Sequence, residues 1–211
     1  MLKFFSFLLP SLLLFFSNCS ASYAQTLLEG KQYSKLVKEI KDAPEVIEFF
    51  SFYCPPCAAF SIHLGINKVL EKNLPNNLKL VKYHVNTMGE LGQELTDAWS
   101  IATVLGVQDE VEEPLFKAVQ EKRNIHTEED IKKIFIDAGV SAEKFDSVKN
   151  SFAVRAMTQK QINAAKDFKV VGTPSFYIAG KYVVHNNGIE GSDISNYSSE
   201  FSNVVNALLD K

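Results

Sequence analysis

Cysteine is scarce in this 211-residue sequence, which has three, at Cys19, Cys54 and Cys57. A disulfide-stapled secreted domain uses more cysteines and longer loops, and a pair this close restrains almost no chain entropy. Structural zinc usually takes four ligands from two such pairs, and the sequence has no second pair. His63 would be a lone third ligand. A structural role therefore does not explain the pair at Cys54 and Cys57 well. Zinc ligation and an inert disulfide stay open as the less favoured alternatives.

Basic tracts and long apolar runs are also missing. The 22 Lys and Arg residues against 25 Asp and Glu give a formal net charge of −3, and no basic cluster would attract a phosphate backbone or an anionic bilayer. We therefore expect no nucleic-acid partner. No segment reaches the roughly 20 apolar residues that a membrane span needs. With 22% charged and 46% hydrophobic residues, the composition is typical of globular proteins.

The first 24 residues have the layout of a secretory signal peptide. Lys3 precedes an apolar stretch over residues 4–16, and small and polar residues follow. Ser22 and Ala24 are the small residues that a signal peptidase recognises, so we expect cleavage near Ala24 and export of the mature chain. Cys19 follows an asparagine, where a lipidation site would have a small residue, and its lipidation stays open.

The residues on either side of Cys54 predict a strand that leads directly into a helix. After a short amphipathic stretch at 34–41, residues 45–53 (EVIEFFSFY) are almost continuously apolar, which is typical of a strand buried on both faces. Residues 58–72 have apolar side chains at helical spacing, and Pro55 and Pro56 suit a first helical turn. A second strand at 78–85 completes a βαβ unit with parallel strands.

The remaining sequence predicts helices and then a hairpin. Helices are expected at 90–104, 114–121, 127–139 and from 141 to about 167, followed by strands at 175–179 and 182–185 and a helix at 194–209. This order predicts an α/β, thioredoxin-like fold (βαβ…ββα) with an inserted all-helical subdomain. The expected domains are 1–24 for the signal peptide, 25–87 and 169–211 for the two parts of the thioredoxin-like domain, and 88–168 for the insert.

The spacing of Cys54 and Cys57 suits a redox-active dithiol. Cysteines at i and i+3 across the first turn of a helix have Cα atoms about 5 to 6 Å apart, the separation that a disulfide needs. Cys54 at the N-cap faces free N–H groups and the positive end of the helix dipole, which lower its pKa. Cys54 is therefore the predicted nucleophile, and Cys57 the residue that resolves a mixed disulfide.

Two further features accompany the cysteines. Glu48 interrupts the apolar strand, and a buried carboxyl there would have a raised pKa and could exchange protons with the cysteines. Lys82 in the neighbouring strand could pair with Glu48; the alternative is a Glu48 side chain that points to solvent at a sheet edge. Thr173 and Pro174 precede the late strand, and base rates alone favour a trans peptide bond between them.

These segments, taken in order, resemble the DsbA family of periplasmic disulfide-introducing proteins. The resemblance covers nearly all of the mature chain and is carried by VIEFFSFYCPPC at 46–57, VKYHVN at 81–86, PLF at 114–116, IFIDAG at 134–139, VGTP at 171–174 and GKY at 180–182. It implies an exposed attacking Cys54 and a buried Cys57. It also implies that Pro174 is a cis proline that helps hold an extended substrate strand, and that Glu48 and Lys82 are the charged residues beneath the site.

The resemblance also implies a physiological setting. The substrates would be unfolded or newly exported proteins that contain cysteine, and a quinone-linked membrane protein of the DsbB type would reoxidise the pair. A periplasmic location and a monomer are expected, with no metal and no other cofactor.

Two positions depart from the family pattern. The family's usual histidine before the second cysteine is Pro56, which removes a group that stabilises the thiolate and makes the disulfide less oxidising. Thr173 stands where the best-known members have valine and where related isomerases and reductases often have threonine. A reductase or isomerase on the same scaffold, and a non-catalytic exported holdase or copper carrier, therefore remain alternatives to an oxidase.

Overall fold

The computed structural model describes residues 27–211; the predicted signal peptide, its cleavage position at Ala24 and Cys19 lie outside the described residues. Within residues 27–211 the centre of the fold is a five-stranded sheet in the order β1-β5-β4-β2-β3. The strands are β1 Tyr33–Lys35, β2 Val46–Phe50, β3 Leu80–His84, β4 Ser175–Ile178 and β5 Tyr182–Val184. Strands β2 and β3 are parallel, and the other neighbours are antiparallel.

Strand β2 lies inside the sheet, and each of its five side chains is at most 1% exposed. Ile47 and Phe49 pack with Phe168 on one face of the sheet, while Val46 packs with Phe176 on the other. Both faces are covered, which explains the nearly continuous apolar sequence. The prediction of a doubly buried strand leading to Cys54 is confirmed.

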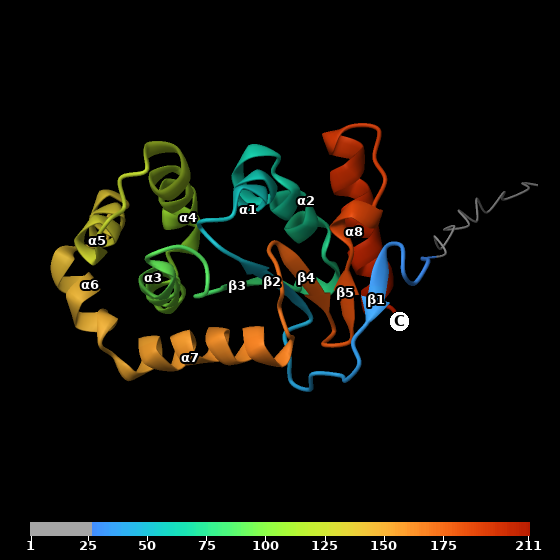
Figure 1. Ribbon diagram of the computed structural model, residues 1–211, viewed down its shortest axis with the longest axis horizontal. Coiled ribbons are helices and arrows are strands. Elements are labelled where there is room, and N and C mark those ends of the chain that lie inside the picture. Colours follow the sequence, from blue (N-terminus) through green and yellow to red (C-terminus); the bar gives the residue numbers. More distant parts are fainter. Residues whose placement is uncertain (1–26) are drawn as a thin grey trace, which may run out of the picture.

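Helices cover both faces of this sheet (Figure 1). Helices α1 Pro55–Ala58, α2 Ile66–Asn73 and α8 Ile194–Leu209 lie on one side, and α7 Phe152–Asp167 runs across the other. The predicted C-terminal hairpin and final helix agree with β4, β5 and α8 to within one residue at each end. No helix within residues 27–211 has the length and hydropathy to cross a bilayer.

The single helix expected over 58–72 is interrupted. Helix α1 continues as a π-helical turn, Ala59–His63, and α2 begins only at Ile66. Between them Gly65 has a φ of +64°, in the left-handed region that glycine enters without the steric cost other residues incur. The apolar spacing continues through the break, which is why periodicity alone predicted one helix.

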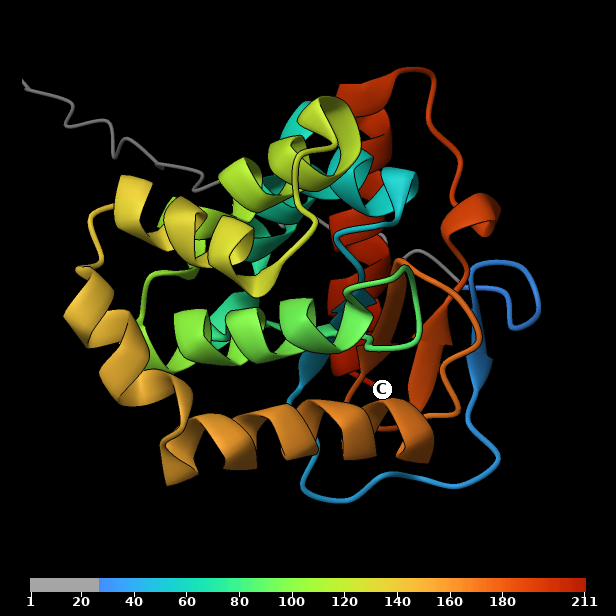
Figure 2. The same cartoon turned by 60° about the vertical axis from the view of Figure 1, so that its left-hand side comes forward.

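The region between β3 and β4 contains helices only, as expected, but five rather than four. They are α3 Gly92–Leu105, α4 Gln108–Phe116 with a π-helical extension Lys117–Lys122, α5 Glu128–Asp137, α6 Ala142–Lys149 and α7. Figure 2 shows α7 running alongside α3 at the front of the molecule. Whether residues 88–168 form a separate domain stays a prediction.

Two helix boundaries in this region were predicted wrongly. The helix expected from Ser141 to about 167 ends at Lys149, because the Ser151 side chain accepts a hydrogen bond from the Val154 N–H and caps a new helix. Helix α4 begins at Gln108 and not at Pro114, which lies inside it. The expected helix at 114–121 rested on its amphipathic spacing, whereas the acidic first turn of α4, at Asp109 and Glu110, was the better signal for its start.

Strand β1 was not predicted. Residues 34–41 were interpreted as a short amphipathic stretch, but Tyr33–Lys35 pair antiparallel with β5 and the chain then leaves the sheet. Three residues are too few to establish the alternating pattern by which strands are recognised.

Both cysteines belong to a buried cluster that joins the sheet to the helical region. Cys54 and Cys57 pack in one apolar cluster with Phe52, Trp99 and Phe116. The dithiol therefore lies where the βαβ unit meets helices α3 and α4, and residues from both sides can act on it.

Candidate active site

Cys54 is the N-cap residue of α1. Its backbone is extended, with φ −95° and ψ 110°, and its Sγ accepts a hydrogen bond from the Cys57 backbone N–H at 3.3 Å. Hydrogen bonds from Cys57 lower the pKa of Cys54 to about 6, against an opposing effect of burial. Much of Cys54 is therefore thiolate at neutral pH, the reactive form of a cysteine.

Pro55 and Pro56 limit the number of donors that reach this sulfur. They occupy the first two positions of α1, and their side chains are exposed. An N-cap group normally accepts from the second or third backbone N–H of its helix, but proline has none. The third amide, that of Cys57, is therefore the donor to Cys54 Sγ.

Cys57 lies one turn into α1 and is 0% exposed. Burial, the hydrogen bond with Cys54 and the nearby charge of Glu48 raise its pKa far above the ordinary value. Both cysteines are free thiols here. The two pKa values move in opposite directions, so Cys54 is suited to attack or to leave as a thiolate, and Cys57 is suited to remain protonated.

The attacking cysteine is less accessible than the family resemblance implied. Cys54 is 3% exposed rather than openly exposed. The reason is the loop before β4: the Thr173 carbonyl accepts a hydrogen bond from Cys54 Sγ at 3.2 Å, and the Thr173–Pro174 peptide bond is cis. Pro174 is buried, and its carbonyl accepts from Asn186 Nδ2 at 2.9 Å. The loop thus places a backbone carbonyl directly at the sulfur.

Glu48 is fully buried and does not point to solvent, so the sheet-edge alternative is wrong. It lies opposite Lys82 in the parallel register of β2 and β3, and Lys82 Nζ is 3.3 Å from Glu48 Oε2. Burial raises the pKa of Glu48 to about 7, although Lys82 lowers it. For Lys82, burial acts to lower the pKa, but Glu48 and Glu112 together raise it.

Three residues that the sequence did not single out complete the cluster around Glu48. Asn67 Nδ2 donates to Glu48 Oε2 at 2.7 Å and to Ser61 Oγ at 3.0 Å. Lys82 Nζ donates to Ser61 Oγ at 2.7 Å and pairs with Glu112 of α4. Ser61 and Asn67 lie in the predicted helix at 58–72, which has several other polar residues, so neither position gave a specific signal. Glu112 gave no signal, because α4 reaches the site only through tertiary packing.

A buried histidine supports the turn that precedes the cysteines. His84 Nε2 accepts the Phe52 backbone N–H at 3.1 Å, and its Nδ1 lies 2.8 Å from Thr96 Oγ1. Burial lowers the pKa of His84 to about 3, so the ring is neutral at physiological pH and can accept this bond. His84 therefore helps to fix the backbone two residues before Cys54.

Gln120 fixes the same turn from the helical side. Its Nε2 donates to the Phe52 carbonyl at 2.7 Å and to the Cys54 carbonyl at 3.0 Å. The side chain comes from the π-helical extension of α4. One amide thus ties the helical region to the backbone of the attacking cysteine.

Replacing Gln120 with leucine is expected to weaken the site. Two part-buried carbonyls would lose their donor, at a cost of about 1 to 3 kcal/mol in the free energy of unfolding. A looser N-cap would also raise the pKa of Cys54 and slow its alkylation by iodoacetamide near pH 6. Chemical unfolding and alkylation rates measure both effects. The exposed Gln159→Leu is the matched control, and equal losses in both variants would contradict this role.

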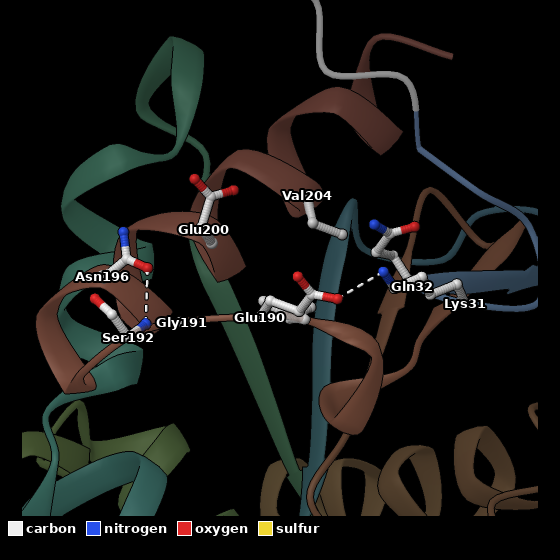
Figure 3. A pocket seen from close by; sticks show the side chains of 9 residues that line it. Lys31, Gln32, Glu190, Gly191, Ser192, Asn196, Glu200 and Val204 are labelled. Carbon is white, nitrogen blue, oxygen red and sulfur yellow. Dashed lines mark hydrogen bonds and ion pairs between the residues drawn. The ribbon is translucent and has the colours of Figure 1, made fainter.

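A hollow of about 600 Å³ is separate from the cysteine site and contains none of its residues (Figure 3). It lies between Lys31–Gln32 and the segment 189–204, and no cysteine or histidine lines it. Lys31 and Glu190 form an ion pair there, and both side chains are exposed to solvent. No group of three or more His, Cys, Asp or Glu side chains within residues 27–211 is arranged to hold a metal ion.

Comparison with known proteins places the chain in a family. Residues 45–193, more than half of the chain, match the model of the DSBA-like thioredoxin domain. Relatives named thiol:disulfide interchange protein DsbA from Dickeya dadantii and from Escherichia coli strain K12 are 41% and 40% identical to it. These matches cover 95% and 96% of this chain, and the same shares of the two relatives.

Solved structures agree. The disulfide oxidoreductase DsbA from Proteus mirabilis superposes with a TM-score of 0.86 at 46% identity, over 90% of this chain and 100% of that one. A cysteine-to-serine variant of the Proteus mirabilis protein, in complex with a non-covalently bound peptide PWATCDS, has a TM-score of 0.85 at 46% identity over 88% and 99% of the two chains. The predicted fold class and the predicted thiol:disulfide oxidoreductase activity are confirmed. The chain belongs to the DSBA-like thioredoxin domain family.

Proposed function

We propose that this chain is an exported oxidase that introduces disulfide bonds into newly exported proteins through Cys54 and Cys57. The observation that carries the proposal is that, within one helical turn, the pKa of Cys54 is lowered and the pKa of Cys57 is raised. A thiol with a low pKa is the better leaving group in disulfide exchange. Cys54 is therefore readily expelled from a mixed disulfide, which favours release of an oxidised substrate.

The proposed reaction proceeds in two exchanges. A substrate thiolate attacks Cys54 Sγ of the Cys54–Cys57 disulfide; a mixed disulfide forms at Cys54, and Cys57 leaves and takes up a proton. A second substrate thiolate then attacks the substrate sulfur of that mixed disulfide and expels Cys54 as a thiolate. The substrate loses two electrons and the cysteine pair gains them.

The loop at 171–174 is the proposed substrate contact. Val171 is fully exposed beside the Thr173–Pro174 bond, and the Thr173 carbonyl already lies at Cys54 Sγ. The backbone of this loop would form main-chain hydrogen bonds with an extended substrate peptide. Such bonds give affinity with little preference for particular side chains. The peptide bound to the Proteus mirabilis relative contains one cysteine, which supports a cysteine-containing polypeptide as substrate.

The setting that we propose follows the family. The chain would act in the periplasm as a monomer after removal of residues 1–24, and a membrane protein of the DsbB type would reoxidise it. We also keep the domain bounds 25–87, 88–168 and 169–211 as a proposal; the position of α3 to α7 between β3 and β4 supports them.

The test of direction is the reduction potential of the Cys54–Cys57 pair, measured by equilibration with glutathione. DsbA has a potential of about −120 mV and thioredoxin one of about −270 mV. We expect a value closer to that of DsbA. A value near that of thioredoxin would favour the alternative of a reductase or isomerase, and the DsbB-type partner would fall with the oxidase.

The variant Pro56→His calibrates this measurement. It restores a backbone N–H at the second helical position and adds an imidazole donor beside Cys54. If the donors set the potential, the variant should be more oxidising by about 30 mV for each unit by which the pKa of Cys54 falls. If the reduction potential does not change with the pKa of Cys54, the stability of the Cys54 thiolate does not decide whether the protein oxidises or reduces its substrates.

A further inference from the structure

Lys82 is shared between two carboxylates that come from different parts of the fold. Its ammonium lies 3.3 Å from Glu48 Oε2 in the sheet and contacts Glu112 Oε1 of α4. Exposure rises along this series: the Glu48 side chain is 0% exposed, that of Lys82 10% and that of Glu112 17%. The three residues form a continuous charged path from the buried carboxyl toward the surface.

This path ends at a hollow that admits solvent. A cavity of about 530 Å³ is lined by Ser61, Asn67, Lys82 and Glu112, among others, and opens between the sheet and α4. Glu48 itself does not line it. Its Oε1 has no hydrogen-bond partner among residues 27–211, and its Oε2 is held by Asn67 and Lys82.

The chemistry requires such a path. Each time Cys57 leaves the disulfide it must take up a proton, and its charge interacts with that of Glu48. A fully buried carboxyl that does not exchange protons with solvent could supply a proton once and could not regain it for the next turnover. Asn67 has no proton to transfer, so the ionisable residues between Glu48 and the hollow are Lys82 and Glu112.

We propose that Glu112 is a positioning residue for thiol–disulfide exchange and acts through Lys82. It holds the Lys82 ammonium between Glu112 and Glu48, so that Glu48 keeps a proton for Cys57. It also connects Glu48 to solvent. This inference deepens the proposed function and rests on it. The helical region thereby supplies part of the proton path as well as covering the cysteines.

The surrounding charges give the sign of the effect. Glu112 raises the pKa of Glu48 and Lys82 lowers it. The other charged groups that line the hollow are Lys68 and Glu71 of α2, Lys79 beside β3, and Asp109 and Lys160 of the helical region. Removal of the Glu112 charge ends its repulsion of Glu48 and leaves Lys82 to pair with Glu48 alone. Both changes favour an ionised Glu48.

The test is Glu112→Gln in the full mature chain, with the neighbouring Glu113→Gln as matched control. Glu113 is exposed and pairs with Lys117, so its loss removes the same charge without touching Lys82. The pKa of Glu48, measured by carbon NMR of its carboxyl group, should fall from about 7 by about one unit in Glu112→Gln and stay unchanged in Glu113→Gln. The protonated fraction of Glu48 above neutral pH would then drop about tenfold.

A kinetic readout accompanies the titration. In stopped-flow reduction of the Cys54–Cys57 disulfide by glutathione, the pH dependence of Cys57 release should move to lower pH in Glu112→Gln by the same amount. If Glu112→Gln does not fold, Glu112→Asp retracts the charge without removing it and should lower the pKa of Glu48 by a smaller amount.

An unchanged pKa of Glu48 in the Glu112 variants, or an equal shift in Glu113→Gln, would overturn the proposal. The titration needs no substrate, so its result is independent of the reduction potential. A potential like that of thioredoxin would refute the oxidase while leaving the Glu112 effect on Glu48 measurable.

Discussion

Replacing Cys57 with serine is expected to stop the chain at a mixed disulfide. Cys54 in this variant keeps its N-cap position and the hydrogen bond from the backbone N–H of residue 57, so it still forms a thiolate. It will attack oxidised glutathione and retain one glutathione, because no second thiol remains to displace it. Turnover should be lost, and mass spectrometry should find nearly all of the protein with one bound glutathione.

The converse variant is the control. Cys54→Ser leaves Cys57, which is 0% exposed and whose pKa is raised by burial, so it should neither react with glutathione nor turn over. Two inactive variants with opposite adduct yields would assign attack to Cys54 and resolution to Cys57. Equal adducts at both cysteines would mean that the environment of α1 does not separate their roles.

Local sequence predicted the part of the site that is local in the chain. Strand β2, the N-cap position of Cys54 and the final hairpin and helix were all predicted, because each depends on residues within one or two turns or on a continuous apolar run. The ion pair of Glu48 and Lys82 was also proposed, since parallel register aligns neighbouring strands of one βαβ unit.

What the sequence did not reveal depends on packing between distant segments. Glu112 and Gln120 lie on α4 and its extension, and they reach Lys82 and the Cys54 carbonyl only because α4 packs over the end of β2. Neither residue is unusual in its own helix. Breaks at Gly65 and Ser151 were missed for a related reason, since a cap or a left-handed glycine can interrupt a periodic pattern without altering it.

The helical region therefore does more than cover the sheet. Trp99 Nε1 donates to the Lys82 carbonyl at 2.8 Å, Gln120 holds the Cys54 carbonyl, and Glu112 pairs with the Lys82 ammonium. Each contact joins a helix to the backbone or the charge beside the cysteines. The reactivity of the dithiol is thus set by both parts of the fold.

The reduced protein is expected to lose stability relative to the oxidised protein as pH falls from about 9 to about 5. The pKa of Cys54 is about 6 in the folded chain against an ordinary value of 9.0. A lowered pKa stabilises the folded state fully above the unfolded value, and that stabilisation is lost as pH falls through the folded value. Three units correspond to about 4 kcal/mol, which is the upper limit of the expected loss.

The comparison of the two redox forms isolates Cys54 from the other titrating groups. Glu48 has a raised pKa, so it costs stability as pH rises from about 4.5 to about 7, but it does so in both forms. Cys57 stays protonated in the folded chain and adds a cost only near and above pH 9. Urea unfolding of both forms at several pH values measures the difference. Cys54→Ser cannot form the disulfide, so it is the control for the reduced form and should lack the loss of stability that the Cys54 thiolate causes as pH falls. A difference independent of pH would mean that the thiolate is not stabilised by the fold, and the driving force for oxidising substrates would be absent.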